Sequence, residues 1–432
     1  MMGSARLGSD HSSASARLEA LLLGIATAFI GVNTLALALL GLGGGSVWAQ
    51  SLVWAAAAWG GWWYLRVRLP NHDPYLYALV MFLSGWGLLL IDRLAPNFSD
   101  RQTVWLSLSV VALCATATTP LLLQWLQRYR YLLLLLGLGL LISTIVFGRN
   151  PSGLTGAPAL WLGLGDVFFQ PSELLKIILV AFLASYLSDQ HLTLRLSGGR
   201  RWQQAWMSPR MLGPMLLMWS ICVVVLVWQR DLGTAMLFFI IFVVLIYVAS
   251  GQWWLLLSGG ILALAAGIAG YAAFEVVRLR VDIWLNPWPY ADGRAYQIVQ
   301  SLMAFSSGGV LGRGAGLGSP GYIPVVHSDF VFAALAEEWG LVGVAALIAA
   351  FSVILMRGMR AALDQQHSPF NVLLAVGLTA SLGVQTLLIL GGVLKLLPLT
   401  GVTLPFVSYG GSSLLMSFVM VGLLLRLSCE RD

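Results

Sequence analysis

Acidic side chains at the edges of long apolar segments are the residues best suited to chemistry in this sequence. Asp329 lies near the start of the segment "IPVVHSDFVFAALAEEWG" (323–340), and Glu337 and Glu338 follow about two helical turns later. A single carboxylate can act as a general base or bind a divalent cation. Asp329 is therefore the candidate catalytic residue, and also a candidate ligand for Mg²⁺ or Mn²⁺.

Basic side chains that we expect near these acids suit an anionic headgroup on a lipid substrate. The candidates for this role are Lys176, Arg230, Arg280 and Lys395. The long apolar segments predict membrane-spanning helices, and of the five histidines only His327 is expected on the same side of the membrane as Asp329. The sequence therefore disfavours both a histidine zinc site and a Ser-His-Asp triad, and a carboxylate mechanism remains.

Each candidate also has a purely structural explanation. Glu173 and Lys176 are three residues apart and can neutralise each other on one helix face. Asp329, preceded by Ser328, can cap the helix that follows. Glu337 and Glu338 lie deep enough in their segment that we expect one of them to be protonated or paired structurally. The small residues of "SYGGSS" can serve close packing between helices.

The composition shows which elements must position these residues. The chain has 432 residues, 59% of them hydrophobic and 10% charged, with a mean hydropathy of +0.84. Such a chain is an integral membrane protein, and its continuous apolar runs predict helices. We therefore predict an all-α polytopic fold of about twelve transmembrane helices. The runs are 18–43, 47–65, 75–92, 103–124, 131–147, 171–187, 211–228, 232–249, 252–274, 330–355, 371–394 and 405–425.

The predicted organisation has three parts. Residues 1–17 are Ser/Ala/Arg-rich and are interpreted as a disordered cytoplasmic tail. Two helices in 18–70 precede a ten-helix core in 71–432. Between the ninth and tenth helices lies a long extracytoplasmic loop, 275–329, with a short helix predicted near 295–306. Its glycine-rich end, 308–318, is predicted to be a mobile loop that covers the substrate.

The distribution of Lys and Arg predicts the orientation. With both termini in the cytoplasm, fourteen basic residues lie on the inner side and five in the short outer loops. The net charge of +6 then reflects contact with anionic membrane lipids, and nothing supports binding to nucleic acid. The three cysteines indicate no disulfide framework. In this orientation the polar clusters around Glu173, Arg230, Asp329 and 404–413 all fall at the outer leaflet.

Five motifs give the chain a strong resemblance to the SEDS (shape, elongation, division and sporulation) family, which contains the FtsW and RodA peptidoglycan glycosyltransferases. They are "QPSELLKI" (170–177), "RDLGTA" (230–235), "NPW" with "YQIVQSLMAFSSGGVLGRGAGLG" (286–318), "HSDFVFAALAEEWGLVG" (327–343) and "LPLTGVTLPFVSYGGSSLL" (397–415). Together they span most of the chain after residue 75.

The resemblance implies an inverting glycosyltransferase that polymerises lipid II on the outer face of the bacterial cytoplasmic membrane. The acceptor hydroxyl would attack the donor's anomeric carbon, and the lipid pyrophosphate would leave. A class B penicillin-binding protein would be its partner. Asp329 matches the essential acid of the family. The positions that match family residues around the central cavity are Trp105, Glu173, Lys176, Glu338, Ser408, Tyr409, Gly410, Gly411 and Ser412.

Two roles for Asp329 remain open at this stage. It could accept the proton of the attacking hydroxyl, or it could hold a cation or orient the substrate. A helix N-terminus stabilises an ionised carboxylate and makes it a weak base, which favours the second role.

The sequence also departs from the common family pattern. The two N-terminal helices are additional to the usual ten, and Arg230 and Lys395 replace other residues within two motifs. These changes leave open whether the chain serves elongation or division. The alternatives to a polymerase are a lipid II flippase and, less well matched by the motifs, a ligase of the O-antigen type.

Overall fold

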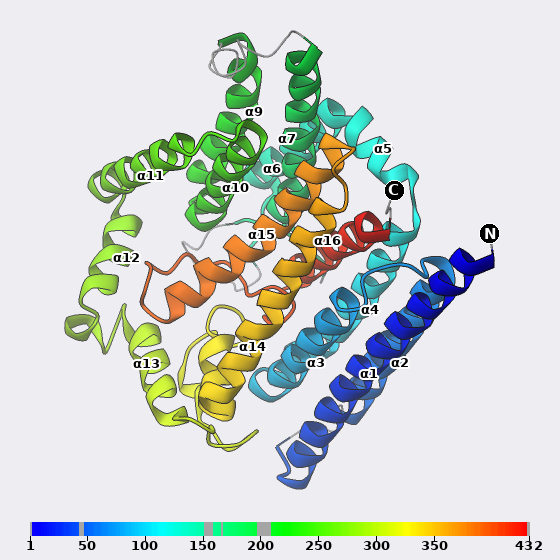
Figure 1. The fold of residues 1–432 in the computed structure, drawn as a ribbon. Helices are drawn as coiled ribbons and strands as arrows, with labels where there is room; N and C mark the ends of the chain where they lie inside the picture. Colours follow the sequence, from blue (N-terminus) through cyan, green and yellow to red (C-terminus); the bar gives the residue numbers. More distant parts are fainter. Residues whose placement is uncertain (1, 43–46, 151–158, 166, 197–208, 430–432) are drawn as a thin grey trace. The chain divides into compact units, whose positions relative to one another are not determined.

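The computed structural model describes residues 2–42, 47–150, 159–165, 167–196 and 209–429, and Figure 1 shows their fold. Most of the described chain is helical. The described residues contain one small sheet, in which Leu162–Leu164 pairs antiparallel with Val167–Phe169. The predicted all-α fold is therefore confirmed.

The first of two compact units is formed by Met1–Thr118, Phe274–Arg357 and Gln385–Cys429. Its N-terminal half contains four helices, α1 (Met2–Leu39), α2 (Val47–Arg68), α3 (Leu76–Leu94) and α4 (Pro96–Thr118). The remaining elements are α12 (Glu275–Leu285), the 3₁₀ turn η1 (Trp288–Tyr290), α13 (Tyr296–Gly308), the 3₁₀ turn η2 (Pro320–Tyr322), most of α14 (Val331–Leu363) and α16 (Gly411–Cys429).

The second unit is formed mainly by Thr119–Ala273 and Gly358–Val384. Its elements are α5 (Leu121–Arg128), α6 (Arg130–Phe147), β1 (Leu162–Leu164), β2 (Val167–Phe169), α7 (Pro171–Leu196), α9 (Pro209–Trp228), α10 (Leu232–Ser250), α11 (Trp254–Ala273) and most of α15 (Pro369–Val393). A tight turn joins α9 to α10, and Asp231 caps α10 by accepting a hydrogen bond from the Thr234 N–H (3.2 Å).

A helix lies at each of the twelve predicted segments. Among the described residues, nine helices are long and apolar enough to cross a membrane, and a tenth span arises if α4 and α5, bent by 85°, are taken together. Helix α2 and the short apolar part of α9, Gly213–Trp228, complete the set. The structure thus confirms a polytopic protein, whereas the exact number of twelve spans stays a prediction.

Two parts of the predicted organisation differ from the structure. Helix α1 begins at Met2, although residues 1–17 were expected to be disordered. The Ala, Leu and Arg residues of this stretch are good helix formers, so the membrane helix continues into it. Helix α12 was not predicted, because its charged residues interrupt the apolar pattern. The helix expected near 295–306 is present as α13.

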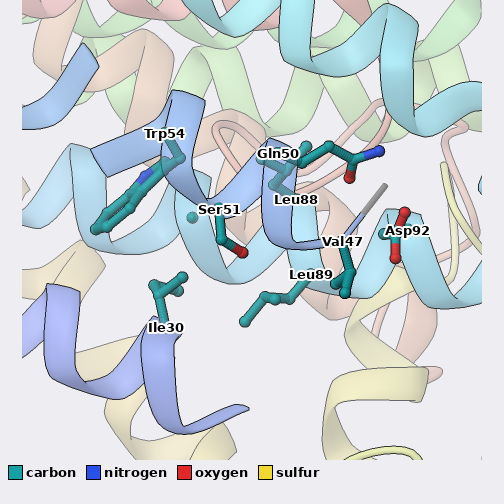
Figure 2. A pocket seen from close by; sticks show the side chains of 9 residues that line it. Ile30, Val47, Gln50, Ser51, Trp54, Leu88, Leu89 and Asp92 are labelled. Atoms are coloured by element: carbon teal, nitrogen blue, oxygen red, sulfur yellow. The ribbon is translucent and has the colours of Figure 1, made fainter. Parts of the chain in front are cut away.

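The two additional helices, α1 and α2, pack on the core of the first unit. The Trp54 indole donates a hydrogen bond to the Met81 carbonyl of α3 (3.0 Å), and Gln50 donates to the Ser99 hydroxyl of α4 (2.7 Å). Figure 2 shows the small cleft that α1, α2 and α3 leave between them. It is lined by Ile30, Val47, Gln50, Ser51, Trp54, Gly85, Leu88, Leu89 and Asp92. Most of these side chains are apolar, which is typical of helix packing.

Candidate active site

Asp329 lies in the loop that leads into α14 and is half-buried. Its carboxylate accepts a hydrogen bond from the hydroxyl of its neighbour Ser328 (3.0 Å). Within the described residues, no backbone N–H of the first turn of α14 donates to this side chain, so the predicted helix-capping role is not realised. The carboxylate is left available for another partner.

The electrostatic surroundings of Asp329 favour its protonated form. Desolvation by burial raises the pKa of this carboxyl above its ordinary value, and the Ser328 hydrogen bond and the positive charge of Arg280 oppose the rise only in part. A carboxylate with a raised pKa is a stronger base than an ordinary aspartate. The direction of this shift is opposite to the one that we expected from a helix N-terminus, and the choice between a base and a cation ligand stays a prediction.

The segment before α16 holds the Asp329 loop in place. The Ser408 hydroxyl donates to the Ser328 carbonyl (2.6 Å), and the Tyr409 N–H donates to the His327 carbonyl (2.9 Å). The predicted "SYGGS" segment therefore lies directly beside the predicted catalytic residue. Both loops contain a non-glycine residue with positive φ, Val325 (54°) and Phe406 (67°). Such backbone strain persists only where the surroundings enforce it, and it is frequent at functional sites.

One face of α4 contacts this same segment. Phe98, Gln102 and Trp105 are spaced by four and three residues, so they share a helix face. Phe98 packs against Tyr409, and the Gln102 side chain bonds to the Ser408 carbonyl (3.5 Å) and to the Gly410 N–H (3.4 Å). The Trp105 indole lies so close to the backbone that a side chain at Gly411 would collide with it.

The two cations predicted in this unit have different surroundings. Arg280 of α12 donates to the Thr400 carbonyl (3.3 Å) and acts on Asp329 through its charge. Lys395 adopts a left-handed backbone conformation (φ 59°) after α15. Its ammonium group donates to the Leu285 carbonyl (3.4 Å), and its own carbonyl accepts from the Trp284 indole (3.1 Å). Lys395 thus connects the end of α15 to α12.

Glu338 serves a structural role in this fold rather than lining an open site. Its side chain is only 1% exposed and forms an ion pair with Arg93 of α3. It also accepts a hydrogen bond from the Gly316 N–H (3.1 Å), while Arg93 donates to the Gly316 and Gly318 carbonyls (2.8 Å each). The structural alternative for Glu338 is therefore favoured over direct substrate binding. Arg93 was one of the five basic residues counted in the short outer loops, and nothing in the sequence indicated this partnership.

Backbone hydrogen bonds hold the glycine-rich loop against α14, whereas the sequence suggested a mobile loop. Helix α14 is broken at Gly340 (φ 62°, ψ −160°), which frees backbone groups on both sides of the break. The Arg313 and Gly314 N–H groups donate to the freed carbonyls of Glu337 and Glu338 (3.0 and 2.9 Å).

The backbone N–H groups that follow the break are also satisfied by the glycine-rich loop. The Leu341 and Val342 N–H groups donate to the Gly309 and Val310 carbonyls (3.0 and 3.1 Å). A side chain at Gly312 would collide with the Glu338 backbone. The glycines therefore permit close backbone approach, which the sequence pattern alone did not distinguish from mobility.

The remaining predicted residues lie in the second unit. Glu173 and Lys176 form an ion pair on the first turns of α7 (2.7 Å), and the Lys176 side chain is 1% exposed. This is the mutual neutralisation that their spacing suggested. Arg230 is exposed in the tight turn between α9 and α10, with a left-handed backbone (φ 61°).

A metal centre built from protein side chains does not fit the described residues. No group of three or more His, Cys, Asp and Glu side chains gathers anywhere in the part of the chain that the structure describes. Asp329 could contribute one ligand to a cation held mainly by substrate phosphates, as is common for Mg²⁺.

Several described helices are apolar and long enough to cross a membrane, and a half-buried carboxylate lies in the loop before one of them. These features define a polytopic membrane protein with a polar site at the N-terminus of a helix. Residues 74–432 match the FtsW/RodA/SpoVE family, described as "Cell cycle protein". The chain belongs to this family, which confirms the resemblance predicted from its motifs.

Relatives in several bacteria share most of the chain. It is 36% identical to the peptidoglycan glycosyltransferase RodA of Mycobacterium tuberculosis over 375 residues, 84% of this chain and 79% of the relative. It is 32% identical to the probable peptidoglycan glycosyltransferase FtsW of Pseudoalteromonas translucida, over 83% of this chain and 89% of the relative.

Two solved structures have the same fold. One comes from work described as "Structural coordination of polymerization and crosslinking by a peptidoglycan synthase complex", with a TM-score of 0.69 and 30% identity over 84% of this chain and 99% of that one. The other is the rod shape determining protein RodA of Thermus thermophilus, with a TM-score of 0.60 and 28% identity over 83% of this chain and 97% of that one.

The contact between Gly411 and Trp105 predicts different effects for two adjacent glycines. Gly411→Ala should displace the indole and lower both the melting temperature and the polymerising activity, because the added methyl group meets a rigid ring. Gly410→Ala is the matched control for stability, since its new side chain would make only ordinary contacts of 3.6–3.7 Å. Equal melting temperatures of the two variants would contradict this packing.

The Arg93–Glu338 pair predicts a strong dependence of each charge on the other. Glu338→Gln should lower the free energy of unfolding by about 3–5 kcal/mol, because it leaves the guanidinium without its buried partner. The double variant Arg93→Met/Glu338→Met should regain much of that loss, since no unpaired charge remains. Additive losses in a double-mutant cycle, measured by denaturant unfolding in detergent, would show that the two charges act independently.

Proposed function

We propose that this chain is a peptidoglycan glycosyltransferase that polymerises lipid II into glycan strands at the outer face of the cytoplasmic membrane. The observation that carries this proposal is the half-buried Asp329 with a raised pKa, in a motif whose loop is hydrogen-bonded to Ser408 and Tyr409 of a second family motif. The names of its RodA and FtsW relatives, peptidoglycan glycosyltransferases, support the same reaction.

In the proposed mechanism Asp329 acts as the general base. Its carboxylate accepts the proton of the 4-hydroxyl of the acceptor sugar while that oxygen attacks the anomeric carbon of the donor. The bond to the polyprenyl pyrophosphate breaks, the leaving group takes the electron pair, and the anomeric configuration inverts. Arg280 limits the rise in the pKa of Asp329 and so favours the ionised form that accepts the proton.

Substrate contacts remain proposals for the other predicted residues. Trp105, Ser408, Tyr409, Gly410, Gly411 and Ser412 are placed in or beside the segment that holds the Asp329 loop. Arg280 and Lys395 of the first unit offer positive charge to the pyrophosphate. In the second unit, Arg230 stays a predicted substrate contact, whereas Glu173 and Lys176 are first of all partners of each other. A divalent cation enters the proposal only as one brought by the substrate phosphates, with Asp329 as a single ligand.

We further propose a class B penicillin-binding protein as the partner, since one structural neighbour comes from work on a peptidoglycan synthase complex that coordinates polymerisation and crosslinking. Both termini are proposed to be cytoplasmic, because fourteen basic residues on that side against five in the short outer loops satisfy the positive-inside rule.

Replacement of Asp329 separates function from stability. Asp329→Asn should reduce lipid II polymerisation by the purified chain at least about 100-fold, because general-base catalysis contributes roughly 10²–10⁴-fold. Burial raises the pKa of Asp329 in the folded state, so its stabilising effect is full at low pH and is lost as pH rises through that pKa. At neutral pH the carboxylate opposes folding, and the Asn variant should melt at an equal or higher temperature.

The matched control is Asp292→Asn, which changes an exposed acid in the same long loop and should leave polymerisation unchanged. Full-length glycan from Asp329→Asn would overturn the proposed role. Transfer of lipid II across vesicles by a wild-type chain that makes no glycan would instead favour the flippase alternative.

The pH profile of polymerisation should report the Asp329–Arg280 interaction. Activity should rise with pH as the carboxylate ionises, and its acid limb should lie above the ordinary aspartate value of 3.8. Arg280→Gln should move that limb to higher pH, because it removes a charge that lowers the pKa, whereas Arg280→Lys should keep the limb near its original position. An acid limb that is the same in the wild type and in Arg280→Gln would contradict this assignment.

A further inference from the structure

Three aromatic rings gather beside the Asp329 loop from three distant parts of the sequence. Phe98 belongs to the first turn of α4, His327 precedes Asp329 by two residues, and Tyr409 precedes α16. The ring centroid of Phe98 lies 5.0 Å from that of His327 and 4.7 Å from that of Tyr409. The ring centroids of His327 and Tyr409 are 5.7 Å apart. The cluster therefore forms one continuous aromatic surface.

The exposure of these rings distinguishes them from the aromatic core. Phe406 and Phe418, which pack together in the same unit, are 2% and 0% exposed. Phe98, His327 and Tyr409 are each only half-buried. A cluster that served packing alone would gain more from full burial, so the exposed part of these rings is available to a ligand.

His327 adds an unused polar group to this surface. Its backbone carbonyl accepts from the Tyr409 N–H, which fixes the position of the residue. Within the described residues its two ring nitrogens have no hydrogen-bond partner from the protein. Burial lowers the pKa of the imidazole, so at neutral pH the ring is neutral, with one nitrogen that donates and one that accepts.

The other polar groups of the cluster are already engaged. Tyr409 is hydrogen-bonded through its hydroxyl to Arg101, one turn from Phe98 on α4. The Ser408 hydroxyl holds the Ser328 carbonyl. The cluster thus combines fixed aromatic faces with one free hydrogen-bonding ring, two residues from the proposed base.

We propose that Phe98, His327 and Tyr409 form a saccharide-binding subsite that holds the acceptor sugar beside Asp329. The flat aromatic faces pack against the C–H face of a pyranose ring, and an imidazole nitrogen bonds to a hydroxyl or acetamido group of the same sugar. This inference rests on the proposed function, because it identifies the sugar with the acceptor whose hydroxyl Asp329 deprotonates. It assigns Phe98 and His327 to substrate binding, a role that the sequence motifs did not indicate.

The test measures binding and turnover separately on the full-length chain in detergent. Binding of the free N-acetylglucosaminyl-N-acetylmuramyl disaccharide is followed by saturation-transfer NMR, and lipid II polymerisation gives KM and kcat. Phe98→Leu and His327→Gln should each weaken disaccharide binding and raise KM by about tenfold, with a smaller change in kcat. Phe98→Tyr, which keeps the ring, should bind like the wild type.

Two further variants separate binding from packing. His327→Phe keeps the ring cluster but removes both nitrogens, so it should keep the melting temperature and still bind the disaccharide more weakly. Phe305→Leu is the matched control, because Phe305 is also half-buried but packs against Phe332 (5.3 Å) instead of the cluster. Should Phe98→Leu fail to fold, His327→Phe decides the question.

The outcomes distinguish the subsite from the proposed function. Wild-type disaccharide affinity in His327→Phe, His327→Gln and any folded Phe98→Leu would overturn the subsite, even if Asp329→Asn abolishes polymerisation. Loss of disaccharide binding in the cluster variants of a chain that makes no glycan would support the subsite and reject the polymerase.

Discussion

The cost of removing charge from water governs where acidic side chains occur in this apolar chain. A buried carboxylate needs a cation or several donors, and several of the acids here have a cationic partner. Glu338 is paired with Arg93, Glu173 with Lys176, and Glu19 of α1 with His72 (3.0 Å). Asp329 has a neighbouring hydroxyl and the charge of Arg280, which together offset its burial only in part. Its incomplete compensation is what raises its pKa and suits it to accept a proton.

The site is assembled from loops, but regular elements fix those loops. Helix α4 presents Phe98, Gln102 and Trp105 at helical spacing to the segment that precedes α16. That segment in turn holds the carbonyls of His327 and Ser328. The strained backbones of Val325 and Phe406 occur where the two loops are held together. The position of His327, two residues before Asp329, thus depends on residues of α4 that lie more than two hundred positions earlier in the chain.

The features that could be predicted from sequence are those with a local cause. Apolar runs predicted the helices. The grouping of Asp329 with Ser408 came instead from the family resemblance that the "HSDF" and "SYGGSS" motifs carry. The partnership of Arg93 with Glu338 could not be predicted, because the two residues are far apart in sequence and neither carries a local signal. The same holds for the glycine-rich loop, since glycine permits both mobility and close approach. Phe98 was missed for a third reason: a single aromatic residue in apolar sequence carries no spacing that marks a site. His327 stands in the "HSDF" motif, but no role in binding was predicted for it.

The break at Gly340 has a consequence for how this part of the chain folds. A continuous helix satisfies its own backbone groups, but here those around the break are satisfied by residues 309–314, about thirty positions earlier. The glycine-rich loop and the part of α14 around the break need each other to reach their final conformations. Either segment alone would leave buried backbone donors and acceptors unsatisfied. The start of α14 and the glycine-rich loop therefore form and open together as one cooperative unit.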